Sequence, residues 1–150
     1  MSKKLKILAV SSSGGHWIQL NRLRPFLSKH DTTYVSTDKT LKVTVSENFF
    51  SVRDANMCDK FGLIIQSFQI LFVVVRVKPD IIISTGAAPG FFSMLIGKIF
   101  RKKTIWVDSM ANANEMSLAG MKSRKFADIW LTQWPELASD NGPMFKGQVL

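Results

Sequence analysis

Residues 5–17 read LKILAVSSSGGHW, an apolar run followed by three serines, two glycines, a histidine and a tryptophan. The run at 5–10 predicts a strand and a helical pattern begins at Trp17, so the glycine turn lies between a first strand and a first helix. The first N–H groups of a helix have no partners within the helix and carry the positive end of its dipole. Ser13, Gly14 and Gly15 therefore predict a site where a diphosphate can approach the backbone.

This turn also has a simpler interpretation. The G-x-G-x-x-G spacing of dinucleotide-binding folds is absent, and glycine at such a turn can serve only to bend the chain. His16 adds proton-transfer chemistry, because imidazole titrates near neutral pH, but a histidine at a strand end can also only bond the backbone. Both interpretations stay open from this motif alone.

The size of the chain limits its organisation. Its 150 residues, 46% of them hydrophobic, can bury one core but are too few for two nucleotide-binding domains, so we expect a single domain over 1–150. Cys58 has no second cysteine to pair with, and no secretory signal pattern opens the chain. We expect a cytoplasmic protein.

The charge predicts an anionic neighbour. Twenty Lys and Arg against eleven acids give a formal net charge of +9. The cationic clusters are separated by apolar and aromatic stretches, and no nucleic-acid-binding signature is present. We therefore favour an anionic membrane surface over nucleic acid.

Apolar runs alternate with helical patterns, which is typical of an α/β fold with a parallel sheet covered by helices on both faces. Ligands then bind outside the carboxyl ends of the strands. Pro25 is expected to kink or end the first helix. Strands are expected at 5–10, 33–36, 49–52, 80–84, 104–107 and 129–131, and helices at 17–29, 61–77, 90–100 and in part of 115–126.

The helix predicted at 61–77 is apolar on two sides. It is slightly shorter than the roughly 20 residues of a transmembrane helix and contains Gln66 and Gln69, so we expect that it does not span. The second apolar side could meet lipid headgroups, a partner subunit or the protein's own core. We assign as the core side Phe61, Ile64, Ile65, Phe68, Leu71, Phe72 and Val75, and as the second side Leu63, Ile70, Val74 and Val77.

Two further loops follow predicted strands. The sequence at 84–90, STGAAPG, repeats the opening design, so Thr85, Gly86 and Gly90 predict a second anion-binding turn, or else a tight connection into a helix. After the next strand, Asp108 and Glu115 could orient His16 or contact sugar hydroxyls. The two histidines lie in unrelated contexts, so we expect no metal site and no cofactor.

Taken together, the ordered motifs resemble one family. It is the membrane-associating, acceptor-side subunit of two-part GT-B glycosyltransferases, found in eukaryotic asparagine-linked glycosylation and in bacterial capsule and exopolysaccharide synthesis. The similarity runs over nearly the whole chain. The motifs are SSGGHWIQL at 12–20, STGAAPG at 84–90, Asp108-Ser109, SLAG at 117–120 and ADIWLTQWPEL at 127–137.

This resemblance implies the N-terminal lobe of a GT-B enzyme. Such a half-enzyme holds a polyprenyl-diphosphate-linked sugar acceptor and recruits a separate C-terminal-lobe subunit that binds the UDP-sugar. Eukaryotic members carry an N-terminal transmembrane helix, whereas here the first predicted strand begins at residue 5. We therefore expect peripheral attachment to the cytoplasmic face of the membrane.

The resemblance also implies roles for site residues. By analogy with the single-chain enzyme that forms lipid II, Gly14 and Gly15 contact the acceptor diphosphate and His16 assists the attacking hydroxyl, with Asp108 as the alternative base. The competing interpretations are a self-sufficient nucleotide-binding enzyme and, on charge alone, a nucleic-acid-binding module.

Overall fold

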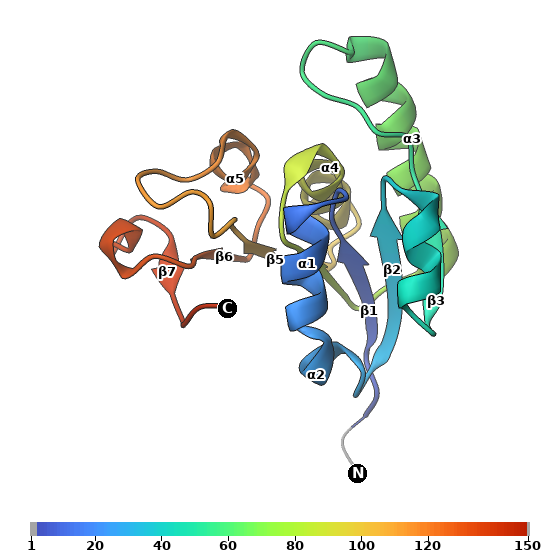
Figure 1. The fold of residues 1–150 in the computed structure, drawn as a ribbon, viewed down its shortest axis with the longest axis horizontal. Helices are drawn as coiled ribbons and strands as arrows, with labels where there is room; N and C mark the ends of the chain where they lie inside the picture. Colours follow the sequence, from blue (N-terminus) through green and yellow to red (C-terminus); the bar gives the residue numbers. More distant parts are fainter. Residues whose placement is uncertain (1–2, 150) are drawn as a thin grey trace.

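The computed structural model describes residues 3–149 and shows one parallel sheet in the order β3-β2-β1-β4-β5-β6-β7 (Figure 1). The predicted Rossmann-like α/β architecture is confirmed, and β7 is an edge strand that the sequence analysis did not predict. The strands are β1 (Lys6–Val10), β2 (Asp31–Ser36), β3 (Asn48–Ser51), β4 (Ile81–Ser84), β5 (Lys103–Val107), β6 (Ile129–Thr132) and β7 (Met144–Phe145).

Helices cover both faces of the sheet. On one face, Trp17 and Leu20 of the first helix pack on Ile7 and Ala9 of β1; on the other, α3 and α4 pack on Leu8 and neighbouring strand residues (Figure 1). The elements are α1 (Gly15–Arg22), α2 (Arg24–Leu27), α3 (Lys60–Val77), α4 (Ala87–Ile99), α5 (Leu118–Ser123) and the 3-10 turns η1 (Lys39–Thr44) and η2 (Pro135–Leu137).

Two helix boundaries follow from proline. The predicted break at Pro25 is confirmed, because α1 ends at Arg22 and a separate short helix carries Pro25 in its first turn. The prediction that the helix at 90–100 begins at Gly90 is wrong, because the corresponding helix, α4, already begins at Ala87. Pro89 fits there because the first helical positions need no internal N–H donor.

The predicted orientation of α3 is wrong. The side chains of Ile70, Val73 and Val74 are buried in the core, whereas most of the face that we assigned to the core is open to solvent. Since both faces are apolar, hydrophobicity alone could not choose between them. We call the exposed set the outer face of α3: Phe61, Ile64, Phe68, Phe72 and Val75.

Two glutamines explain why α3 packs this way round. The buried Gln66 donates Nε2 to the carbonyl of Arg53 at 2.7 Å, and Gln69 Oε1 accepts from the Arg53 N–H at 2.7 Å. Both backbone groups of one residue in the β3–α3 connection are therefore satisfied by side chains one turn apart on α3. This anchor turns the glutamines inward and the outer face outward.

Among residues 3–149, α3 is the one helix long and apolar enough to cross a membrane, by length and composition only. Its inner side packs on the sheet, so in this structure it serves as a core helix with a second, uncovered apolar face.

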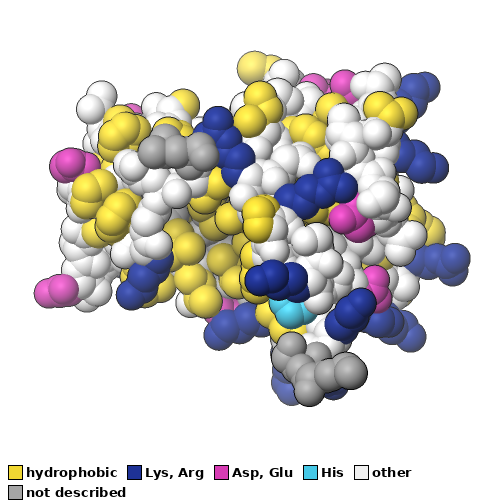
Figure 2. Space-filling model, turned by 60° about the horizontal axis from the view of Figure 1, so that its bottom comes forward, with side chains coloured by type: hydrophobic (Ala, Val, Ile, Leu, Met, Phe, Trp, Pro, Cys, Tyr) yellow, Lys and Arg dark blue, Asp and Glu magenta, His cyan; other side chains and the backbone are white. Residues whose placement is uncertain are grey.

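Asp128, directly before β6, binds the amino end of β5. Burial opposes ionisation of this carboxyl, but the N–H and hydroxyl of Thr104 and the ammonium of Lys98 outweigh it and lower its pKa. A shallow basic cavity of about 470 Å³ lies here, with Lys98, Arg101 and Lys103 in its lining. Figure 2, which brings the lower side of Figure 1 forward, shows Lys and Arg side chains spread over that face of the molecule.

The assignment of the two faces of α3 predicts unequal effects of two truncations. Replacing the fully buried Ile70 by Ala should lower the free energy of unfolding by about 2–5 kcal/mol, because a cavity remains in the core. Replacing Phe72, which is 62% exposed, by Ala should change the free energy of unfolding by less than about 0.5 kcal/mol. Urea denaturation measures both, and equal losses would contradict the assignment.

Candidate functional site

The candidate site lies where β1 and β4 run side by side. Val10 and Ser84, the last residues of these strands, are register partners. The chain continues from β1 toward β2 on one side and from β4 toward β5 on the other, so the strand order reverses between them. Such a switch point leaves a crevice at the carboxyl ends of the strands, which is where open α/β sheets bind ligands.

Both helices that begin at this crevice lack a side-chain cap. α1 follows Gly14 (φ 71°) and α4 follows Gly86 (φ 145°), and neither glycine supplies an acceptor for the first N–H groups. By contrast, Asp59 and Ser117 cap α3 and α5 with side-chain oxygens at 2.8 and 2.9 Å. α2 also lacks a side-chain cap, but α1 and α4 are the two that begin at the switch point, so their N-termini are placed to bind an external anion there.

His16 joins these two helix starts. Its Nδ1 lies 3.0 Å from the carbonyl oxygen of Thr85, and the Thr85 hydroxyl donates to the His16 carbonyl at 2.7 Å. Because the Thr85 carbonyl can only accept, Nδ1 carries the proton in this hydrogen bond. Nε2 is then the ring nitrogen left to accept a proton, as a general base requires.

Gly86 and Gly15 have different surroundings, so glycine is needed at only one of these two positions. A side chain on Gly86 would overlap the His16 ring, so this glycine makes room for the imidazole. A Cβ on Gly15 would meet no atom within 4 Å, and Gly15 does not have a positive φ. Gly15 is therefore not required by the packing of the protein itself, and the space in front of it is open.

The other predicted residues of the two turns lie at different depths. Ser13 is part of the first turn, where its N–H donates to the Thr37 hydroxyl at 3.1 Å. Gly90 lies inside α4, buried against Ser84 and Trp106, because the helix begins earlier than we predicted. The structure thus brings together Ser13, Gly14, Gly15, His16, Thr85 and Gly86, with Gly90 behind them as a packing residue.

Asp108 is buried and its carboxylate holds the β5–α5 connection. One oxygen accepts from Trp106 Nε1 at 3.0 Å and from the Ser117 hydroxyl, and the other accepts from the Ser117 N–H at 2.8 Å. A side chain on Gly120 would strike this carboxylate. Asp108, Ser117 and Gly120 are therefore one packed unit, which explains why the third loop and the start of α5 carry their motifs together.

A buried amide network that the sequence analysis did not assign connects this unit to α1. Gln133 donates Nε2 to the Asp108 carbonyl at 2.8 Å and to Gln19 Oε1 at 3.1 Å. Both glutamines belong to motifs noted above, but their pairing joins segments far apart in the chain. Trp134 adds a bond from Nε1 to the Met110 carbonyl at 2.9 Å, so it fixes the same loop.

Glu115 is exposed on the β5–α5 connection, and among residues 3–149 no hydrogen bond to its side chain is found. Within the same described part of the chain, no group of three or more His, Cys, Asp or Glu is placed to hold a metal ion.

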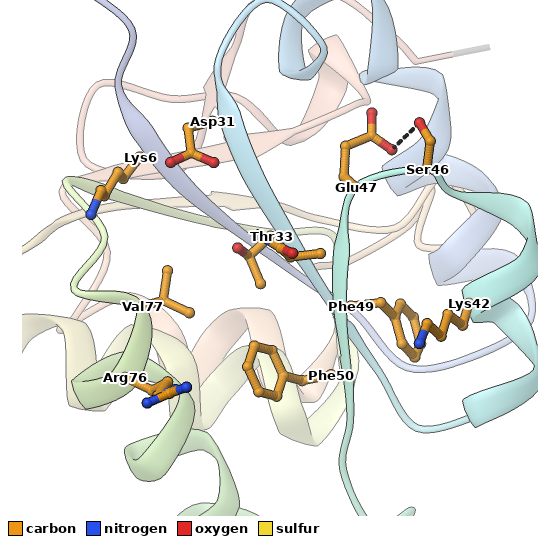
Figure 3. Close-up of a pocket in the computed structure, with 11 residues that line it drawn as sticks. Lys6, Asp31, Thr33, Lys42, Ser46, Glu47, Phe49, Phe50, Arg76 and Val77 are labelled. Carbon is orange, nitrogen blue, oxygen red and sulfur yellow. Dashed lines mark hydrogen bonds between the residues drawn. The ribbon is translucent and has the colours of Figure 1, made fainter.

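A cavity of about 580 Å³ opens elsewhere, at the amino ends of β1 and β2. Figure 3 shows Thr33 and Phe50 between Arg76 on one side and Lys42 on the other. None of the predicted site residues lines it. The switch-point crevice, and not this cavity, therefore holds the chemistry identified from the sequence.

The hydrogen bonds of Asp108 predict a loss of stability in the absence of any substrate. Asp108→Ala leaves the buried Trp106 Nε1 and the partly buried Ser117 N–H without an acceptor, which should cost about 2–4 kcal/mol of unfolding free energy. Thermal and urea unfolding of the purified chain measure this. Unchanged stability with loss of activity would instead favour a purely catalytic carboxylate.

Comparisons with known proteins agree with this architecture. The family model described as "Oligosaccharide biosynthesis protein Alg14 like" matches residues 50–147. The UDP-N-acetylglucosamine transferase subunit ALG14 of Yarrowia lipolytica is 27% identical over 162 residues, covering 89% of this chain and 75% of that protein. The mouse ALG14 subunit is 25% identical, covering 90% and 78%.

Among solved structures, MurG of Acinetobacter baumannii superposes with a TM-score of 0.77 at 10% identity, covering 95% of this chain. The UDP-N-acetylglucosamine 2-epimerase of Rickettsia bellii gives 0.74 at 13% identity and 98%. This chain spans less than half of either neighbour, 45% and 46%, and the likeness shows the fold alone. With the family model matching most of its length, the chain belongs to the Alg14-like family of oligosaccharide biosynthesis proteins.

Proposed function

We propose that this chain is the acceptor-binding subunit of a heteromeric glycosyltransferase that acts on a polyprenyl-diphosphate-linked sugar. The observation that carries the proposal is the meeting of two uncapped helix N-termini at the β1/β4 switch point, with His16 held between them. Relatives named as UDP-N-acetylglucosamine transferase subunits support the same reaction class. The pathway is lipid-linked oligosaccharide or capsular and exopolysaccharide synthesis.

In this proposal the diphosphate lies against the first N–H groups of α1 and α4. Gly14 and Gly15 keep this space free of side chains, Gly86 makes room for the His16 ring, and Ser13 and Thr85 border the space. The positive ends of two helix dipoles stabilise the negative charge. The exposed Glu115 carboxylate is left to contact hydroxyls of the acceptor sugar.

His16 acts as the base. The acceptor hydroxyl oxygen attacks the anomeric carbon of the donor sugar, the bond from that carbon to the nucleotide diphosphate breaks, and the hydroxyl proton passes to Nε2 of His16. The hydrogen bond from Nδ1 to Thr85 fixes the tautomer and the ring orientation during this step. Asp108 supports the loop through its three hydrogen bonds and acts as a positioning residue.

A separate subunit supplies the UDP-sugar. We infer that residues 1–150 form one acceptor lobe, because all strands in the described part of the chain join one sheet. In this proposal a nucleotide-binding lobe lies over the carboxyl ends of β1 and β4, where open α/β sheets bind their ligands. The chain alone is then inactive.

The membrane holds the acceptor and the chain together. Five large apolar side chains form the outer face of α3, and the exposed cations Lys60, Arg76 and Lys78 lie at its two ends. An apolar stripe flanked by cations matches the interface of an anionic bilayer. We infer peripheral attachment to the cytoplasmic face through this surface.

Gly15→Ala tests the diphosphate site. The added methyl group meets no protein atom within 4 Å, so the unfolding midpoint should stay unchanged. In the complex purified from gently solubilised membranes with its copurifying subunit, sugar transfer to a polyprenyl-diphosphate-linked acceptor should fall by about 100-fold, because the methyl group displaces the reacting group by about 1 Å. Gly86→Ala is the contrasting variant, since it must also move His16 and lower stability.

Full activity of Gly15→Ala would place the diphosphate elsewhere. A chain that copurifies with no second subunit and binds a nucleotide unaided would favour the self-sufficient enzyme instead.

Phe68→Glu tests the membrane surface. Phe68 is 65% exposed on the outer face of α3, so a charge there should leave folding intact. Binding to anionic vesicles should weaken by about tenfold, because an apolar side chain is lost and the new carboxylate is repelled by the anionic lipids. Vesicle flotation measures the bound fraction. Met144→Glu, on the edge strand β7 at the other end of the sheet, is the matched control and should bind like the unaltered chain.

A further inference from the structure

An apolar groove lies beside the candidate site and is separate from the outer face of α3. It has a volume of about 470 Å³, within the range of roughly 300–1,000 Å³ typical of small-molecule sites. It runs between the beginnings of α3, α4 and α5, which Figure 1 shows on the upper side, where β1 also ends. The lining residues are Ala55, Asn56, Met57, Leu63, Ala87, Ala88, Phe91, Phe92, Leu118, Ala119 and Lys122.

The shape of the groove comes from the alternation of small and large side chains. Ala87, Ala88 and Ala119 leave space, while Phe91 and Phe92, with ring centroids 5.4 Å apart, form a wall. Leu118, the first residue of α5, also lines the groove and is 62% exposed. Binding of an apolar ligand against these side chains is favourable, because it removes apolar surface from water.

The groove shares a wall with the proposed diphosphate site. Ala87 and Ala88 are the first two residues of α4, directly after Gly86, so one helix turn presents free N–H groups at its start and methyl groups along its side. Ala87 has a φ of 65°, which is unfavourable for a residue with a side chain. Strain of this kind is kept where function requires the local geometry, and here it lies at the junction of the two sites.

Charge is arranged to match an amphipathic ligand. Among the lining residues of the groove, Lys122 is the one charged side chain; it is exposed, and its Nζ lies 3.8 Å from Met57 Sδ at the rim. A ligand with an anionic head at the start of α4 and a hydrocarbon tail would place each part in the environment that favours it.

We propose that this groove binds the first isoprenyl units of the acceptor lipid, the part of the chain attached directly to the diphosphate. The inference rests on the proposed function, because it takes the diphosphate to lie at Gly86. Leu63 belongs to both the groove and α3, so the lipid chain passes from the groove along α3 into the bilayer. The groove therefore sets the position of the diphosphate relative to the membrane.

The test uses three soluble probes with the full chain: farnesyl diphosphate, inorganic diphosphate and farnesol, each titrated by calorimetry. Farnesyl diphosphate should bind at least about tenfold more tightly than inorganic diphosphate, because the groove adds the burial of its chain. Leu118→Gln should weaken the binding of farnesyl diphosphate by about fivefold and leave the affinity for inorganic diphosphate unchanged.

Met121→Gln is the matched control. It makes a similar change on the same helix at a residue that is 53% exposed and is not among the lining residues of the groove, and it should alter neither affinity. Ala88→Leu fills the groove from α4 and is a second test variant. Like Leu118→Gln, it should weaken the binding of farnesyl diphosphate.

The outcomes separate the two proposals. Equal affinity for farnesyl diphosphate and inorganic diphosphate, or equal effects of Leu118→Gln and Met121→Gln, would overturn the groove while leaving the diphosphate site standing. Farnesol binding that Leu118→Gln weakens, with no binding of inorganic diphosphate, would support the groove and contradict the diphosphate site. Absence of binding by all three probes would overturn both.

Discussion

The parallel pairing of β1 with β4 is the constraint on which the remaining structure depends. These strands are adjacent in the sheet but far apart in the chain, and their connections leave in opposite directions. Because α1 packs on one face and α4 on the other, their glycine starts are left facing each other across the strand ends. The two hydrogen bonds between His16 and Thr85 then fasten the two turns to each other.

Most of the fold could be predicted because β1, β4, β5 and β6 are short apolar runs followed by turn signals, whereas the two-residue edge strand β7 has no such pattern. Repeated alternation of such runs with helical patterns leaves a parallel sheet as the simplest arrangement. The orientation of α3 could not be predicted in the same way. Its two faces are similarly apolar, and the choice depends on hydrogen bonds with the backbone of Arg53 in the preceding connection: Gln66 donates to its carbonyl, and Gln69 accepts from its N–H. A pattern read along one helix contains no information about a backbone group elsewhere.

The same distinction applies to the site. The glycine turns and His16 could be identified locally, because glycine before a helix has a direct consequence for anion binding. The position of the Asp108 carboxylate could not, since its role depends on Trp106 beside it and on Ser117 nine residues later. Likewise, Gln19 and Gln133 look like ordinary polar residues until folding brings their amides to 3.1 Å. Contacts between distant segments decide which polar residues hold the loops and which stay free.

Among residues 3–149, two helix N-termini at the switch point have no side-chain cap, and an apolar groove and the outer face of α3 are open to solvent. In the proposed function each of these features has a partner of a different chemistry: an anion for the helix starts, a hydrocarbon chain for the groove, and a bilayer for the outer face of α3. A diphosphate attached to a membrane-embedded prenyl chain contains the first two and brings the third. One ligand of this class therefore accounts for surfaces that would otherwise each need a separate explanation.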